Sequence, residues 1–194
     1  MTLGVTGCSA SGGGAAQSSV PTLPTIPFTT SSTAKTSAPP AATDYRGLLL
    51  SAPDLTDADD TFTERSRDSQ PNGNAGASAF FVNVKDDRAI TDTFLVYPDP
   101  ATATATLKQV AATLPTLVAG GTPTPLAVGT NGVVVSGTYP DQEKAVTLVL
   151  FTEGQALVRL EFQSAVGDPT TDTFVTNVAK MQQIALRIGL AEPQ

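Results

Sequence analysis

Carboxylates are the side chains of this sequence with the chemistry for catalysis, because it contains no histidine and a single cysteine. Two converging carboxylates can act as general acid and base on a glycosidic bond. The glutamates considered for such a pair are Glu64, Glu143, Glu153 and Glu161. All four lie in charged turns or on the polar face of an alternating segment, so we favour a solvated role. The absence of histidine excludes a Ser-His-Asp triad and a histidine metal site, and we expect no catalytic residue and no enzyme.

An acidic segment, DLTDADD at 54–60, has the oxygen ligands that hard cations prefer; its acids are Asp54, Asp57, Asp59 and Asp60. It lacks the glycine and terminal glutamate of a calcium loop. We favour an acidic loop that caps a helix, and expect no metal and no cofactor. Just downstream, Arg65 and Arg67 lie on one face of a predicted edge strand. They could clamp an anion, but a cross-strand acidic partner is the favoured role.

The lone cysteine, Cys8, follows Val5-Thr6-Gly7, an order of branched, small and small residues. This order resembles the lipobox of bacterial lipoproteins, which implies a diacylglyceryl group on the Cys8 thiol and cleavage just before it. A signal peptide needs a basic region and about 7–15 apolar residues, and MTLGVTG has neither. We therefore interpret 1–7 as the truncated end of a signal peptide whose leader begins upstream. The alternative is a free cysteine placed by chance.

Residues 8–43 are rich in Ser, Thr, Pro and Ala, and Lys35 is their one charged residue. Such a composition offers too little apolar surface to offset the entropy of ordering, so we predict a disordered tether with a reach of about 100 Å. Thr29, Thr30 and Thr33 are candidate O-glycosylation sites, and an unmodified spacer is the alternative. With the lipid anchor, the tether predicts a location on the extracytoplasmic side of the cell membrane.

Residues 44–194 are expected to form a single globular domain, because apolar segments and turn signals alternate throughout them. They carry all 18 acidic residues and ten of the 11 basic ones, a net charge of −8. A domain of this charge repels phosphate backbones, so we expect no nucleic-acid partner. The single cysteine also excludes an intramolecular disulfide and a thiolate zinc cluster.

Strand patterns dominate this domain. The segment 44–55 is expected to deliver its leucines to the core as a short helix or a first strand, and Asn131-Gly132 to turn a hairpin. KAVTLVLFT is apolar on both faces and indicates a central strand. The predicted strands cover 61–68, 78–84, 91–97, 125–129, 133–139, 144–152 and 156–164.

Two helices are predicted, each opened by an Asp-Pro pair that supplies a cap and a first residue without an N–H. The first begins at Asp99-Pro100, and Pro115 should kink or end it. Its apolar stripe is Leu107, Val110, Leu114 and Leu117. The last begins at Asp168-Pro169 and ends at Gly189. Its apolar stripe is Phe174, Val178, Met181, Ala185 and Ile188.

The element order predicts an α+β fold, an antiparallel sheet of about six to seven strands with two main helices packed on it. The helix stripes are core residues in the favoured interpretation. A sharper hypothesis is that they partly line an apolar pocket between helices and sheet. The candidate lining residues are Leu107, Val110, Leu114, Phe174, Val178 and Met181.

Three segments, YRGLLLSAPDL, DTFLVYPDPATATATLK and VTLVLFTEGQALVRLEF, with the final helix, resemble small mycobacterial-type lipoproteins of the LpqN kind. They are also similar to extracytoplasmic sensor domains of mycobacterial protein kinases, which carry disulfides that this chain cannot form. The first resemblance implies a PsbP-like fold and a non-enzymatic binding or accessory role in the cell envelope. The expected partner is an envelope lipid, a glycolipid or a protein. The alternatives are a carboxylate-dependent enzyme on cell-wall glycans and a ligand-free surface antigen.

Overall fold

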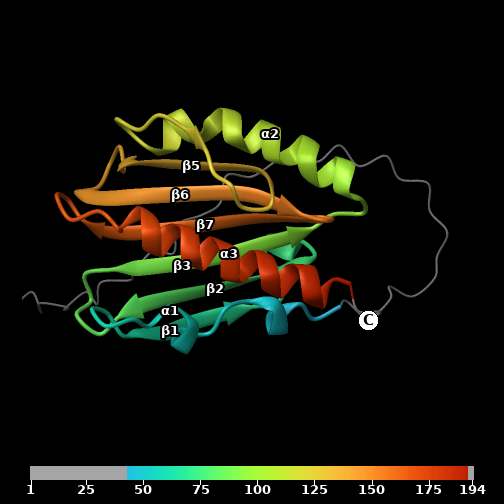
Figure 1. Ribbon diagram of the computed structural model, residues 1–194, viewed down its shortest axis with the longest axis horizontal. Helices are drawn as coiled ribbons and strands as arrows, with labels where there is room; N and C mark the ends of the chain where they lie inside the picture. Colours follow the sequence, from blue (N-terminus) through green and yellow to red (C-terminus); the bar gives the residue numbers. More distant parts are fainter. Residues whose placement is uncertain (1–42, 192–194) are drawn as a thin grey trace, which may run out of the picture. The chain divides into compact units, whose positions relative to one another are not determined.

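Seven strands form one antiparallel sheet in the computed structural model, which describes residues 43–191 (Figure 1). The sheet order is β1-β2-β3-β7-β6-β5-β4. The strands are β1 Phe62–Asp68, β2 Gly76–Asn83, β3 Ala89–Val96, β4 Thr124–Pro125, β5 Thr130–Thr138, β6 Lys144–Glu153 and β7 Ala156–Ala165. The helices are η1 Arg46–Leu48, α1 Ala52–Leu55, η2 Pro71–Gly73, α2 Pro100–Leu117 and α3 Asp172–Gly189. The predicted α+β class and its two main helices are confirmed, while Cys8 and the predicted segments upstream of residue 43 lie outside the described residues.

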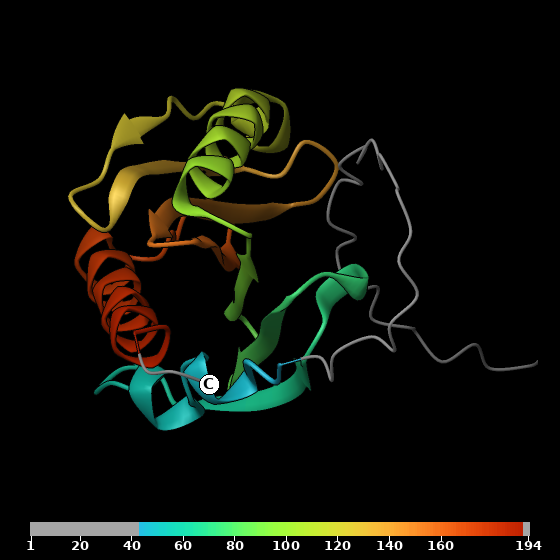
Figure 2. The same cartoon turned by 90° about the vertical axis from the view of Figure 1, so that its right-hand side faces the viewer.

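Strand β6 lies in the interior of the sheet, between β7 and β5, as its apolar sequence predicts. Successive side chains of a strand point to opposite faces, so Leu148 and Leu150 join one hydrophobic cluster while Val149 and Phe151 join another. Helix α2 packs on the first cluster and α3 on the second. The two helices therefore cover opposite faces of the sheet (Figure 2).

Helix α2 begins as its sequence predicts. The Asp99 side chain accepts a hydrogen bond from the backbone N–H of Thr102 at 2.8 Å, with Pro100 as the first helical residue. Leu107 and Leu114 are buried on the sheet, and Val110 and Leu117 are partly buried beside them. Pro115 lies in the last turn, and the helix ends two residues later at Leu117.

Helix α3 differs from the prediction in its start and in its buried face. Thr171, not Asp168, is the N-cap, and its hydroxyl accepts from the backbone N–H of Phe174 at 3.4 Å. Asp168 instead pairs with Arg88 on the β2–β3 turn. The buried face consists of Val175, Val178, Ala179, Gln182 and Leu186. Of the predicted stripe, Val178 is buried and Phe174 and Met181 are partly buried on the same cluster, whereas Ile188 is exposed and Leu186 is buried in its place.

The predicted hairpin is present, because β4 and β5 pair antiparallel, but Asn131-Gly132 does not form its turn. Both residues lie inside β5, where the register with β6 shifts between Thr130 and Val133. Asn131 has a φ of 55°, so it takes the left-handed conformation at a β-bulge rather than in a turn. Asparagine tolerates that conformation in either setting, so the residue pair alone did not distinguish them.

Replacing Leu186 and Ile188 separately by alanine tests the observed phase of α3. Leu186 is 0% exposed and Ile188 is 58% exposed. We expect Leu186→Ala to lower the free energy of unfolding by about 2–5 kcal/mol, and Ile188→Ala by less than about 0.5 kcal/mol. Urea unfolding followed by circular dichroism gives both values. Equal losses would contradict this orientation of the helix.

Candidate functional site

A cavity of about 100 Å³ opens at one end of the sheet, where β1 and β3 begin, β7 ends and α3 starts. Polar and aromatic side chains both reach it. Its lining residues are Asp57, Asp59, Asp60, Phe62, Arg88, Ala89, Ile90, Gln163, Thr170, Thr171 and Phe174. We call it the end cleft.

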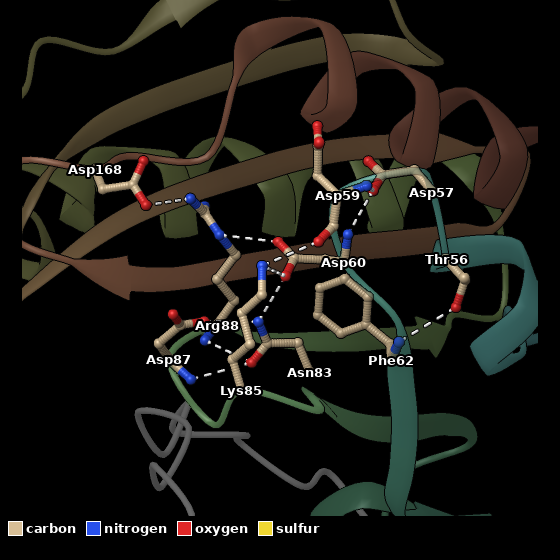
Figure 3. Close-up of polar contacts among 10 residues, drawn as sticks. All are labelled: Thr56, Asp57, Asp59, Asp60, Phe62, Asn83, Lys85, Asp87, Arg88 and Asp168. Carbon is tan, nitrogen blue, oxygen red and sulfur yellow. Dashed lines mark hydrogen bonds and ion pairs between the residues drawn. The ribbon is translucent and has the colours of Figure 1, made fainter.

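One wall of the end cleft is the acidic segment between α1 and β1. The Asp57 carboxylate accepts backbone N–H groups from Asp59 and Asp60, each at 2.9 Å, which fixes the loop as a tight turn. The Thr56 hydroxyl accepts the N–H of Phe62 at 3.2 Å and so joins the loop to the start of β1 (Figure 3). The Asp54 carboxylate accepts the backbone N–H of Ser51 in a capping box on α1. The acids thus cap a helix and shape a loop, as the favoured interpretation predicted.

Asn83, at the end of β2, is fully buried and supports the β2–β3 turn, from which Arg88 lines the cleft. Its amide N–H₂ donates to Asp60 at 2.8 Å and to Asp87 at 2.6 Å. Its amide oxygen accepts the backbone N–H groups of Asp87 and Arg88, both at 3.0 Å. One side chain therefore holds the β2–β3 turn and the acidic loop together.

Arg88 connects three segments that are distant in the sequence (Figure 3). Its Nε lies 3.1 Å from a carboxylate oxygen of Asp60, and its Nη2 donates to Asp168 in the β7–α3 loop. Lys85 adds a second ion pair to Asp60 at 3.3 Å. The sequence analysis did not single out Arg88 or Asn83, because their partners lie up to 80 residues away.

Aromatic rings supply the apolar part of the cleft. Phe62 of β1 stacks on Phe174 of α3 with ring centroids 6.3 Å apart, and both line the cavity. Phe162 of β7 meets the same Phe174 ring edge-on at 6.2 Å. Phe174 is thus fixed by neighbours from two strands, so the cleft has an ordered aromatic side.

The acid with the most contacts in the cleft is Asp60. Burial alone would raise its pKa, but hydrogen bonds from Asn83 and Lys85 and the charges of Lys85 and Arg88 lower the pKa below its usual value. Asp60 is therefore ionised at neutral pH and does not suit the role of a general acid. Across residues 43–191, no three acidic, histidine or cysteine side chains are grouped to hold a metal ion.

The structure does not bring the six predicted pocket residues together. Leu107, Val110 and Leu114 belong to the cluster under α2. Phe174, Val178 and Met181 belong to the cluster under α3, on the opposite face. The sheet separates the two sets, because the two helices cover different faces. Phe174 alone of the six lines the end cleft.

None of the four glutamates considered for catalysis lines the end cleft. Glu153 accepts from Gln183 at 2.9 Å, and Glu143 is exposed. The expectation that Glu161 faces water is wrong, since Glu161 is only 3% exposed and is bound by Tyr139, Arg159 and Gln163. Tyr139 follows β5 in the cluster under α2, so the burial comes from a distant part of the sequence.

The two predicted anion-binding arginines take different roles. Arg67 pairs with Glu64 of its own strand at 2.6 Å across a bulge, not with a cross-strand acid. It also donates to the backbone carbonyls of Arg46 and Leu50. Arg65 is exposed at the bulge itself.

Comparison with known proteins gives one structural likeness. No protein-family model and no curated protein sequence matches the chain. The solved extracellular domain of PknH from Mycobacterium tuberculosis matches it with a TM-score of 0.51 at 9% sequence identity, over 75% of this chain and 98% of that domain. At this identity the likeness shows the fold alone, so the resemblance to LpqN-type lipoproteins stays a prediction. Between residues 43 and 191 no helix is long and apolar enough to span a bilayer.

Replacing Arg88 by glutamine tests the link between the three segments. Asp60 has a lowered pKa in the folded protein, so it stabilises the fold above about pH 4 and loses this effect as the pH falls through the folded pKa. Without Arg88 that pKa rises, and we expect the midpoint of acid unfolding to rise by roughly 0.5 pH unit. Circular dichroism during acid titration measures the midpoint. Arg65→Gln on the exposed bulge is the matched control, and an equal shift there would contradict the assignment.

Proposed function

We propose that this protein is a lipid-anchored binding module of the cell envelope, held on the extracytoplasmic side through Cys8, and that its end cleft binds the sugar head group of a glycolipid. The end cleft carries the proposal, because it combines ordered aromatic rings with carboxylates, hydroxyls and an arginine in one small cavity. Sites of this kind orient a ligand by a few polar groups beside apolar contacts.

The size and charge of the cleft support a hydroxyl-rich ligand. Its volume of about 100 Å³ is below the roughly 300–1,000 Å³ of sites that enclose a drug-sized ligand. It therefore suits an edge of one sugar ring, with the rest of the ring in solvent, and does not enclose an acyl chain. Carboxylates are acceptors for hydroxyl donors, and Asp59 is exposed at the wall of the cleft.

Non-enzymatic binding is favoured over catalysis on glycans by the state of the cleft carboxylates. Retaining or inverting hydrolysis requires one carboxyl group with a raised pKa as the acid. Asp60 has a lowered pKa, and the Asp57 carboxylate is already occupied by two backbone N–H groups of its own loop. A ligand-free antigen is less favoured, since it gives the aromatic and polar lining no role.

Titration of the full chain with short neutral oligosaccharides, followed by NMR, tests the ligand class. We expect the amide signals of the cleft segments 57–62 and 170–174 to shift. Asp59→Asn should weaken binding by roughly ten- to a hundredfold, since hydrogen bonds to charged groups contribute about 1.5–3 kcal/mol. Glu143→Gln, an exposed carboxylate outside the cleft, is the matched control. Shifts confined to other surfaces, or none with any sugar, would refute the proposal.

Lipid anchoring has a separate test. In the natural host, we expect the wild-type chain in the membrane fraction with a diacylglyceryl mass on the peptide that begins at Cys8. Cys8→Ser removes the thiol that forms the thioether and should release the protein into the soluble fraction, whereas Ser9→Ala should leave it on the membrane. Wild-type protein without the added mass would disprove the anchor.

A further inference from the structure

Residues 44–50, which we call the strap, lie on the sheet face that α3 covers. Leu49 and Leu50 are buried in the α3-side cluster, and the Tyr45 ring meets Phe94 of β3 edge-on at 6.3 Å. Leu48 packs so closely on the end of α3 that a Cβ on Gly189 would lie 2.1 Å from its Cδ2. The strap therefore covers apolar core and links the domain to the chain upstream.

Side chains from three elements hold the strap backbone. Arg67 of β1 donates to the carbonyls of Arg46 at 2.8 Å and Leu50 at 2.7 Å. Gln182 of α3 donates to the carbonyl of Leu48 at 3.0 Å. Asp92 of β3 accepts the N–H of Leu50 at 3.3 Å.

Two members of this set, Asp92 and Gln182, each have one buried oxygen without a hydrogen-bond partner among residues 43–191, and Asp92 is the one that can ionise. It is 0% exposed, and within residues 43–191 its Oδ1 has no hydrogen-bond partner. Its register neighbours, Ala79 on β2 and Leu160 on β7, are both apolar and offer no side-chain hydrogen bond. Of the two other side chains that hold the strap, Gln182 is uncharged, and the Arg67 guanidinium is already shared with Glu64 and the strap carbonyls.

We propose that protonation of Asp92 controls whether the strap is closed, so that the strap is held in acid and is released as the pH rises toward neutrality. A protonated carboxyl still accepts the Leu50 N–H through one oxygen and carries no charge into the core. An ionised carboxylate at this position is shielded from water and accepts only the long hydrogen bond from the Leu50 N–H, so its charge is costly in the closed state. Opening the strap exposes Asp92 to water and removes that cost.

The direction of the pH effect follows from the burial of Asp92, which raises its pKa to about 7, against the opposing effects of the Leu50 N–H and the Arg67 charge. In the open state the pKa returns to its ordinary value near 3.9. The closed strap then binds one more proton than the open strap between these two values. Its closing constant should fall about tenfold per pH unit between roughly pH 4 and 7, and level off above.

Hydrogen exchange of the full chain, followed by mass spectrometry at pH 5 and pH 7, tests the proposal once rates are corrected for intrinsic exchange. We expect the protection of peptides covering residues 46–50 to fall about fiftyfold, because the closed-state carboxyl is already half ionised at pH 7, while peptides from β6 keep their protection. In Asp92→Asn the side chain is neutral at both pH values, so this fall should disappear. Gly189→Ala displaces Leu48 without touching Asp92, so it should lower protection of the strap at both pH values and leave the ratio between them unchanged.

Three outcomes would overturn the proposal. A pH effect in Asp92→Asn equal to that of the wild type would show that another group is responsible. A fall in protection of less than threefold in the wild type would show that Asp92 does not control the strap. An equal fall in β6 would show that the whole domain unfolds and that the strap does not open locally.

Discussion

The burial of both faces of β6 and β7 is the constraint on which the rest of the structure depends. Leu148 and Leu150 project to one side of β6 while Val149 and Phe151 project to the other, and all four are at most 1% exposed. Each face needs its own cover, because apolar surface left in water costs about 25 cal/mol per Å². Helices α2 and α3 supply that cover, one on each face. The end cleft and the strap both lie on the face of the sheet that α3 covers.

Helix α3 and the loop before it position the candidate site through both apolar and polar residues. The first turn of α3 places Phe174 against Phe62, while the loop before it places Asp168 on Arg88. Arg88 in turn is oriented by the buried amide of Asn83. The cleft is therefore a consequence of how β7 connects to α3, and the proposed ligand site is supported by buried and ion-paired groups instead of a free loop.

Local signals in the sequence were sufficient for most elements and insufficient for the site. The Asp99-Pro100 cap, the edge strand at 62–68 and the interior strand β6 each follow from residues within a few positions of one another. The start of α3 was misassigned because Asp168 is used by Arg88, 80 residues away, and not by the helix. Its phase was misassigned because Leu186 and Ile188 are equally apolar and only the packed sheet distinguishes them. The six candidate pocket residues are divided between the two faces for the same reason, since no local pattern reveals on which face a helix lies.

Two buried carboxylates show how the same side chain can stabilise one region and leave another ready to change. Glu161, under α2, receives hydrogen bonds from Tyr139, Arg159 and Gln163, and its two oxygens are both used. Asp92, under the strap, has one bond of 3.3 Å to a backbone N–H and an oxygen without a donor in the described domain. A fully bonded buried charge resists rearrangement, because every change removes a partner. An under-bonded one gains partners when its cover moves, so it favours mobility at that cover. In this fold the cover is the segment that leads toward the predicted tether, so the response to pH that we propose for Asp92 should begin there.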